Sequence, residues 1–167
     1  MQGLEGLWYK ECQQGRRFII KITPGENLTT RLLQFAYLAD VRYAAIVSAL
    51  GSVKNVKLRG IKTGAKLPIT PPRVTIHQIE GPLELLGLQG NIVPGEDDLL
   101  DCHFHIMMSK ASGEVVGGHL YEAEVFATCE IVLTELTVEG VERHVSKVGG
   151  IPTIYINESN EAHEGNP

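Results

Sequence analysis

Three histidines in the second half of the chain have the residue type and the spacing of a metal site. His103 and His105 lie two positions apart within the stretch 101–106, and His119 follows a turn-forming segment, 109–113. Side chains alternate between the two faces of a β-strand, so residues two positions apart point the same way. We therefore expect His103 and His105 to present their imidazoles on one side of a strand.

The turn between the two segments decides whether His119 can join that pair. In an antiparallel hairpin, His119 lies opposite His103 if the turn centres on Ala111, and opposite His105 if it centres on Ser112. Both centres fall in the turn-forming segment, and both place all three imidazoles on one face. Three imidazoles without a fourth protein ligand nearby are the composition of an open zinc site. The simpler alternative, a histidine packed singly on a sheet, is the usual interpretation of an isolated one.

Two neighbours of the histidine pair are also possible metal ligands by residue type. Strand alternation sends Cys102 to the opposite face, which argues against a role as ligand. Asp101 lies on the histidine face, where a carboxylate can hold an imidazole in one tautomer. A solvated acid at a strand end is the simpler interpretation of Asp101.

A zinc ion held by three imidazoles leaves one position for water, so metal-dependent chemistry is one hypothesis for function. Such chemistry needs a general base, and the candidates are Glu84, Asp101 and Glu122. Glu84 is our first choice because it is an acid flanked by leucines in a predicted strand. The alternative is an outward polar residue of an alternating strand. A purely structural zinc is less favoured, since closed structural sites usually have four protein ligands.

Composition limits the class of protein. The chain has 167 residues, a formal net charge of −5 and 43% hydrophobic residues, which predicts one globular domain with a core of its own. The sequence has no run of about 20 apolar residues, so we expect no membrane span. The first residues lack the features of a signal peptide. Three cysteines without paired spacing favour a reducing cytoplasm.

The basic residues are candidates for contacts with nucleic acid. Arg16 and Arg17 form one group, and Lys57 and Arg59 belong to a stretch, residues 54–73, that has no acidic residue. The alternative is a solvated face. The negative net charge and the lack of a recognition motif predict only weak, sequence-indifferent DNA binding, because affinity for DNA comes largely from neutralised phosphates.

Hydrophobic periodicity predicts one main helix and many strands. The helix begins after a cap at Asn27 or Thr29 and runs to about residue 39. We expect a hairpin-like pair that turns at Gly51-Ser52, from residues 43–50 and 53–61. The other predicted strands are residues 17–22, 74–79, 83–93, 100–108, 115–120 and 127–137. The domain boundaries are an N-terminal extension (1–14), a single domain (15–157) and a polar tail (158–167).

Six segments, in this order, resemble the PPC (plant and prokaryote conserved) domain family in its stand-alone prokaryotic form. They are Arg17–Lys21, Pro24–Leu28, Ala45–Val53, Leu83–Ile92, His103–His105 and Gly117–Leu120. The resemblance implies an α+β domain built on a strongly bent antiparallel β-sheet with one main helix, assembled as a homotrimer. It also implies that His103, His105 and His119 bind a divalent metal such as zinc.

The family's usual association is with DNA. In plant members an AT-hook with an Arg-Gly-Arg-Pro core precedes the domain, whereas Arg59-Gly60-Ile61 in this chain is not such a core. The resemblance therefore implies a zinc-binding homotrimer that serves as a DNA-binding or transcription-regulatory module. The alternative from a different class is a metal-dependent hydrolase or lyase.

Overall fold

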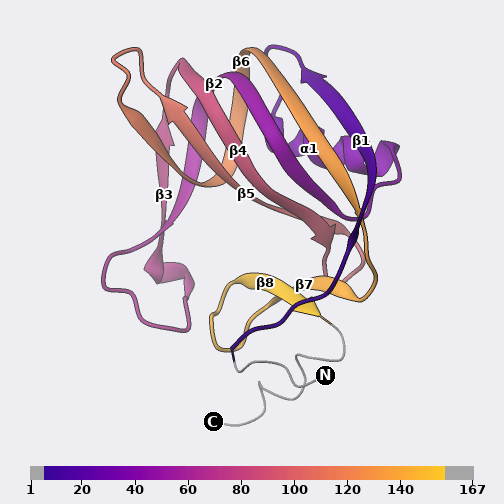
Figure 1. Ribbon diagram of the computed structural model, residues 1–167. Coiled ribbons are helices and arrows are strands. Elements are labelled where there is room, and N and C mark those ends of the chain that lie inside the picture. Colours follow the sequence, from indigo (N-terminus) through magenta and orange to yellow (C-terminus); the bar gives the residue numbers. More distant parts are fainter. Residues whose placement is uncertain (1–5, 157–167) are drawn as a thin grey trace.

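Eight strands and one α-helix make up residues 6–156, the part of the chain that the computed structural model describes (Figure 1). The predicted tail, residues 158–167, lies outside this part. The elements are β1 (Gln13–Ile22), α1 (Leu28–Leu38), β2 (Ala44–Ile61), a 3-10 turn (Pro71–Arg73), β3 (Val74–Ile79), β4 (Leu83–Pro94), β5 (Leu100–Ser109), β6 (Val115–Thr137), β7 (Val141–Val145) and β8 (Pro152–Ile156).

One antiparallel sheet carries most of the fold. Its strand order is β1-β6-β5-β4-β2-β3, and β2 pairs with β6 as well as with β4. Each of the strands β6, β5, β4 and β2 therefore pairs with two others of this set, which closes a ring of strands. Figure 1 shows that these long strands are curved. Register shifts along the β2–β6 ladder mark β-bulges, which bend strands. The predicted α+β fold with a bent antiparallel sheet and a single helix is confirmed.

The predicted hairpin at Gly51-Ser52 is wrong, because β2 runs through this point as one strand of 18 residues. Gly51 sits at a register shift with φ +149° and lies against β6. A Cβ atom at this position would come 2.0 Å from the carbonyl oxygen of Thr128. The glycine therefore serves a bulge and a close approach of two backbones, which use the same residue type as a turn.

The helix begins where the sequence predicts. Asn27 caps α1, and its Oδ1 accepts a hydrogen bond from the backbone N–H of Thr30 at 3.0 Å. Leu28, Leu32 and Ala36 recur at helical spacing and are fully buried against the sheet. The helix thus closes one side of the core.

The two faces of β5 differ, because one packs in the core and the other is more open. Phe104, Ile106 and Met108 are among the most deeply buried side chains of the protein. The alternate residues His103 and His105 point to the other, more open face, as strand alternation requires. Cys102 packs against the core, also on the predicted side.

A second, two-stranded sheet of β7 and β8 follows the main sheet and was not among the predicted strands. It lies beside the sheet end where β4 turns into β5, and Gly95 forms an isolated parallel bridge with Arg143 of β7 (Figure 1). At the other terminus β1 begins at Gln13, inside the predicted extension. Within residues 6–156, no helix combines the length and apolar character needed to cross a membrane.

Candidate metal centre

The hairpin of β5 and β6 takes one of the two predicted registers. His105 pairs directly with His119, which centres the turn on Ser112. The turn is closed by two backbone hydrogen bonds of 2.9 Å, from the N–H of Lys110 to the carbonyl of Glu114 and from the N–H of Gly113 to the carbonyl of Lys110. This register brings His105 and His119 face to face on neighbouring strands, with His103 one step along β5.

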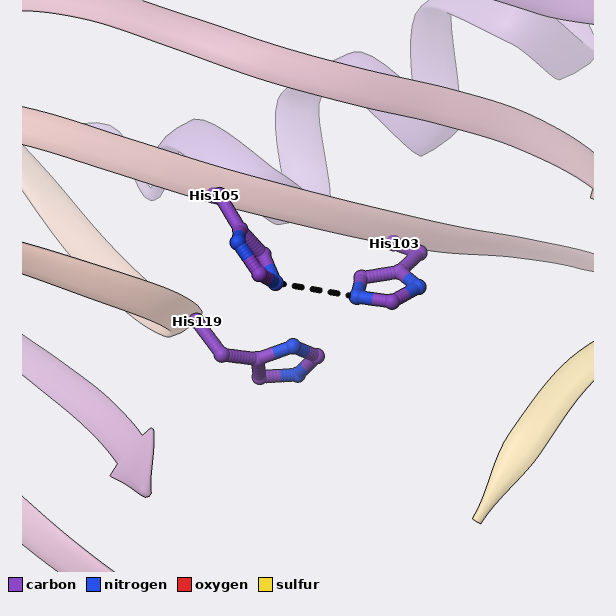
Figure 2. A group of neighbouring side chains, drawn as sticks. All are labelled: His103, His105 and His119. Carbon is purple, nitrogen blue, oxygen red and sulfur yellow. Dashed lines mark hydrogen bonds between the residues drawn. The ribbon is translucent and has the colours of Figure 1, made fainter. Parts of the chain in front are cut away.

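The three imidazoles converge on one point (Figure 2). The Nε2 atoms of His103 and His105 are 3.1 Å apart, and one ring nitrogen from each of the three histidines lies within 4.8 Å of the others. A tetrahedral zinc ion with bonds of about 2.05 Å needs ligand nitrogens about 3.3 Å apart. The 3.1 Å between His103 and His105 is close to this spacing, and the other nitrogen distances exceed it by no more than about 1.5 Å.

The surroundings of His103 and His119 favour the neutral forms of these two imidazoles. Burial, followed by the positive charges nearby, lowers the pKa of His119 to about 4. Burial and then Arg143 lower the pKa of His103 as well. A metal-binding imidazole must be unprotonated, so these shifts favour metal binding at neutral pH. Burial raises the pKa of the Cys102 thiol to about 12, which makes a poor thiolate ligand of this cysteine.

A cavity of about 590 Å³ opens beside the histidines. Asp101 lines it, and its Oδ2 lies 3.2 Å from Nε of Arg143, which comes from β7. Arg143 is only 4% exposed and also donates a hydrogen bond to Oδ1 of Asn91, the residue that pairs with His103 across β4 and β5. The second sheet thus brings a buried cation to the edge of the histidine cluster.

The structure separates Glu84 from the histidines. Glu84 pairs with Ser109 at the far end of β5, roughly 13 Å along the strand from His105 at about 3.3 Å per residue. Glu122 forms an ion pair with Lys57. Of the three candidate general bases, Asp101 is the one that lines the cavity with the histidines.

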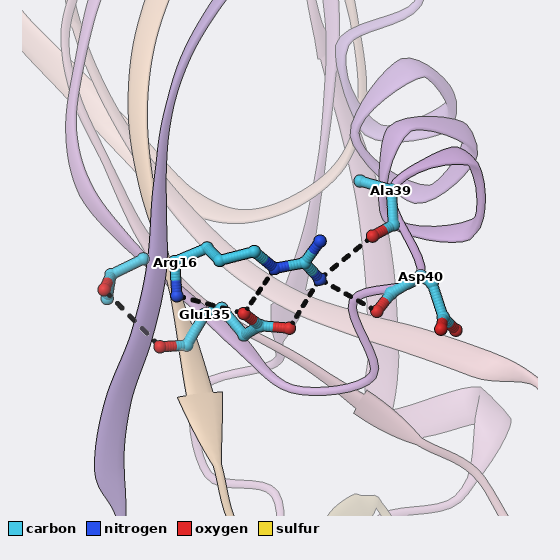
Figure 3. Close-up of polar contacts among 5 residues, drawn as sticks. Arg16, Ala39, Asp40 and Glu135 are labelled. Carbon is cyan, nitrogen blue, oxygen red and sulfur yellow. Dashed lines mark hydrogen bonds and ion pairs between the residues drawn. The ribbon is translucent and has the colours of Figure 1, made fainter.

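The predicted nucleic-acid residues fall in two places. Arg16 is held by Glu135, with Nη2 to Oε1 at 2.7 Å, and by the carbonyls of Ala39 and Asp40 (Figure 3). This pairing lowers the pKa of Glu135 to about 2, chiefly through the hydrogen bonds from Arg16. Arg17 donates to Gln14 at the same end of β1.

Lys57 and Arg59 lie on β2, apart from Arg16 and Arg17 on β1. Lys57 is paired with Glu122, whereas Arg59 pairs with His119 in the β2–β6 ladder and lines the cavity. The structure therefore does not gather the four predicted residues into one basic face. Their role in binding nucleic acid stays a prediction.

Sequence reasoning missed Asn91 and Arg143. The strand pairing of Asn91 with His103 would have pointed to the first, once β4 and β5 were aligned. Arg143 lies in a short segment, Val141–Val145, whose three central residues are all polar, and nothing in its spacing relates it to the histidines.

Comparison with known proteins identifies the family. The model of the Plants and Prokaryotes Conserved (PCC) domain, also abbreviated PPC, matches residues 9–137. The chain belongs to this family. The matched residues include all three histidines, whereas β7 and β8 follow the end of the match.

Solved structures share the PPC fold. A plant- and prokaryote-conserved protein from Pyrococcus horikoshii is 28% identical, with a TM-score of 0.75 over 87% of this chain and 96% of that one. A protein from Archaeoglobus fulgidus, described as metal-containing, is also 28% identical, with a TM-score of 0.77 over 89% of this chain and 99% of that one.

Two curated relatives are much longer proteins. The bifunctional protein GlmU of Synechococcus sp. (strain JA-3-3Ab) is 25% identical over 153 residues, which are 91% of this chain and 22% of the relative. The AT-hook motif nuclear-localized protein 14 of Arabidopsis thaliana is 27% identical over 101 residues, which are 60% of this chain and 22% of the relative. The chain therefore spans about a fifth of the length of these relatives.

Proposed function

We propose that this PPC-family protein binds one divalent metal ion, zinc, through His103, His105 and His119. The observation that carries the proposal is the convergence of three ring nitrogens within 4.8 Å on one open face. Three neutral imidazoles are a donor set that suits zinc, and they leave a further coordination position open. The metal-containing relative from Archaeoglobus fulgidus supports the assignment.

Metal content of purified protein tests this proposal. We expect one zinc per chain in protein prepared without a histidine tag, and a large loss of zinc in His103→Ala, His105→Ala and His119→Ala. The β-sheet should persist in all three by circular dichroism, because the apolar core lies on the other face of β5. The matched control is His77→Ala, an exposed histidine on β3 outside the cluster. Zinc content in His103→Ala equal to that of the wild type would contradict the proposal.

The metal-loaded protein serves as a DNA-associated regulatory module in the cytoplasm. The support is membership of the family and the similarity to a plant protein described by its AT-hook motif. The net charge of −5 and the pairing of Arg16 and Lys57 with carboxylates predict weak, salt-sensitive binding to DNA.

The module assembles as a homotrimer. Large apolar side chains are exposed on β1, β2 and β6, among them Ile19 at 89%, Leu50 at 60% and Phe126 at 46%. Apolar side chains of this size that gather on a surface are typical of protein–protein contacts. Sedimentation equilibrium should report about three times the chain mass of 18.3 kDa. A monomer at micromolar concentration would contradict the assembly.

A metal-dependent hydrolase or lyase is the second candidate, and the cavity beside the histidines favours it. Zinc held by three imidazoles can acidify a bound water to a pKa of about 7. Asp101 lines the cavity together with the three histidines. Glu84 pairs with Ser109 at the far end of β5 from the histidines. Turnover of a hydrolysable ester that is lost in Asp101→Asn, retained in Glu84→Gln and dependent on zinc would favour the enzyme and make Asp101 its base. Loss in Glu84→Gln alone would restore Glu84 to that role.

A further inference from the structure

Two arginines face the cavity beside the histidines, and each has N–H donors that no ion pair uses. Arg143 reaches it from β7, and Arg59 reaches it from β2. We propose that this cavity binds a small organic carboxylate, held by Arg143 and Arg59 next to the metal. The inference deepens the proposed function and rests on it, since the same histidines border the cavity.

Of the two arginines, Arg143 provides the stronger evidence for a carboxylate site. Its side chain is buried, and a buried guanidinium is costly unless its charge and its donors are satisfied. Asp101 supplies one nearby charge at 3.2 Å from Nε, and Asn91 accepts from Nη2. Among the described residues, Nε lacks a hydrogen-bond partner of good geometry, and no hydrogen bond involves Nη1. A guanidinium has five N–H donors in a planar fork, so Arg143 retains donors for a ligand.

Arg59 differs from the other cations of its strand. Lys54 pairs with Glu124, and Lys57 pairs with Glu122. No side-chain hydrogen bond or ion pair within residues 6–156 involves Arg59, although it lies directly opposite His119 in the β2–β6 ladder. Directly opposite residues of an antiparallel pair point to the same face. Arg59 thus projects beside the histidines as an uncompensated positive charge.

The charge and the lining of the cavity define the ligand class. Arg59 and Arg143 contribute two positive charges and Asp101 one negative charge, so the cavity carries net positive charge even before a metal cation is added. The planar fork of arginine matches a carboxylate with two parallel hydrogen bonds. Ile61, Val74 and Ile151 line the remaining wall, which suits an apolar body. A volume of about 590 Å³ is in the range of small-molecule sites.

The position of Arg143 in the chain adds to the inference. The family model ends at residue 137, before β7, which carries Arg143. The metal ligands come from the family's sheet, and one of the two anion-binding residues comes from the sheet that follows it. Both sheets therefore contribute to the proposed carboxylate site.

Calorimetric titration of the full chain, loaded with zinc, tests the inference with three probes. Benzoate is a carboxylate on an apolar body, benzamide is its neutral counterpart of the same shape, and inorganic phosphate is an anion without the apolar body. We expect benzoate to bind once per chain, and benzamide and phosphate to bind at least about tenfold more weakly, the range of one lost charge-assisted interaction.

The variants separate the arginines from the fold. Arg59→Gln changes an exposed side chain, so it tests the site without a risk to folding. Arg143→Lys keeps the buried charge beside Asp101 and removes the planar fork. Both should weaken benzoate binding by about tenfold, whereas the control Arg31→Gln, on α1 and outside this cavity, should bind as the wild type does.

Each result has a defined meaning. Zinc-loaded protein that binds no benzoate, or binds it equally well in Arg59→Gln and Arg143→Lys, overturns the inference and leaves the metal site intact. Tighter binding of phosphate than of benzoate overturns the assignment to an organic carboxylate. If the protein holds no zinc, the proposed function fails. The inference then stands only if metal-free protein still binds benzoate about tenfold more tightly than its Arg59→Gln variant.

Discussion

Acid should destabilise the metal-free protein through His119, because the surroundings of this histidine disfavour its protonated form in the folded state. Burial, then the nearby histidines and arginines, lower its pKa to about 4 from the ordinary value of 6.5. In the unfolded chain the ordinary pKa returns. As the pH falls, the unfolded chain therefore takes up this proton before the folded protein does. Stability that is present above pH 6.5 is lost progressively as the pH falls towards about 4.

The two pKa values also set the size of the effect. Protonation of a group with a pKa of 6.5 unfolded and about 4 folded lowers the free energy of unfolding by about 2 kcal/mol at pH 5. His119 is only partly buried, and solvent screens the interactions of such groups. We therefore expect about half of this value, about 1 kcal/mol.

Urea unfolding of chelator-treated protein at pH 7.5 and pH 5 measures the effect. Carboxylates that titrate in this range contribute equally to the wild type and to His119→Gln, so the comparison isolates the histidine. The loss of unfolding free energy between the two pH values should be smaller by about 1 kcal/mol in His119→Gln. The control His77→Gln should lose as much as the wild type.

Equal losses in the wild type and in His119→Gln would refute the reasoning. That result would mean that His119 is as accessible to protons in the folded protein as in the unfolded chain. The half-buried, neutral state of the His119 imidazole would then be incorrect.

Three further predictions concern other parts of the molecule. Arg16→Gln should raise the pKa of Glu135 from about 2 towards 4.5, because the hydrogen bonds from Arg16 are the main cause of its low value; the carboxyl resonance in an NMR titration measures it, and an unchanged pKa would count against the pairing. Gly51→Ala should lower the free energy of unfolding by more than about 2 kcal/mol, because its Cβ would meet the carbonyl of Thr128; a urea midpoint equal to that of the wild type would show that β2 and β6 are farther apart. DNA binding should be weak and fall steeply with salt, and Lys57→Gln should flatten the log–log slope by about one unit if Lys57 contacts a phosphate; nanomolar, sequence-selective binding at physiological salt would contradict this.

The histidine site could be predicted from the sequence because its geometry is local. Two histidines on one strand share a face by alternation, and a short turn limits where His119 can pair. Both registers allowed by the sequence lead to the same cluster, so the choice of the His105–His119 pair changes only the detail. The helix was predictable for a similar reason, since Asn27 and the apolar periodicity lie within one segment.

The parts that sequence reasoning missed depend on contacts between distant segments. Gly51 has the residue type of a turn, and only the approach of β6 shows that it serves a bulge. Glu84 belongs to a strand that neighbours the histidine strand, but the register places it at the far end. Such distances follow from strand pairing, which a single sequence does not contain.

The second sheet is the clearest example. Burial alternates from Val141 to Arg143, but the second buried position is a charged residue, Arg143. Because a charged residue occupies a buried position, the segment lacks the alternation of apolar and polar residues that predicts a strand. The charge is stabilised by Asp101 and Asn91, which come from two other strands far away in the chain.

The most direct test of the central claim is the metal environment itself. X-ray absorption at the zinc edge, on tag-free protein with one zinc per chain, should show three imidazole nitrogens at about 2.0–2.1 Å and one further oxygen ligand. A sulfur neighbour at about 2.3 Å, or a spectrum unchanged in His105→Ala, would contradict a site built from His103, His105 and His119.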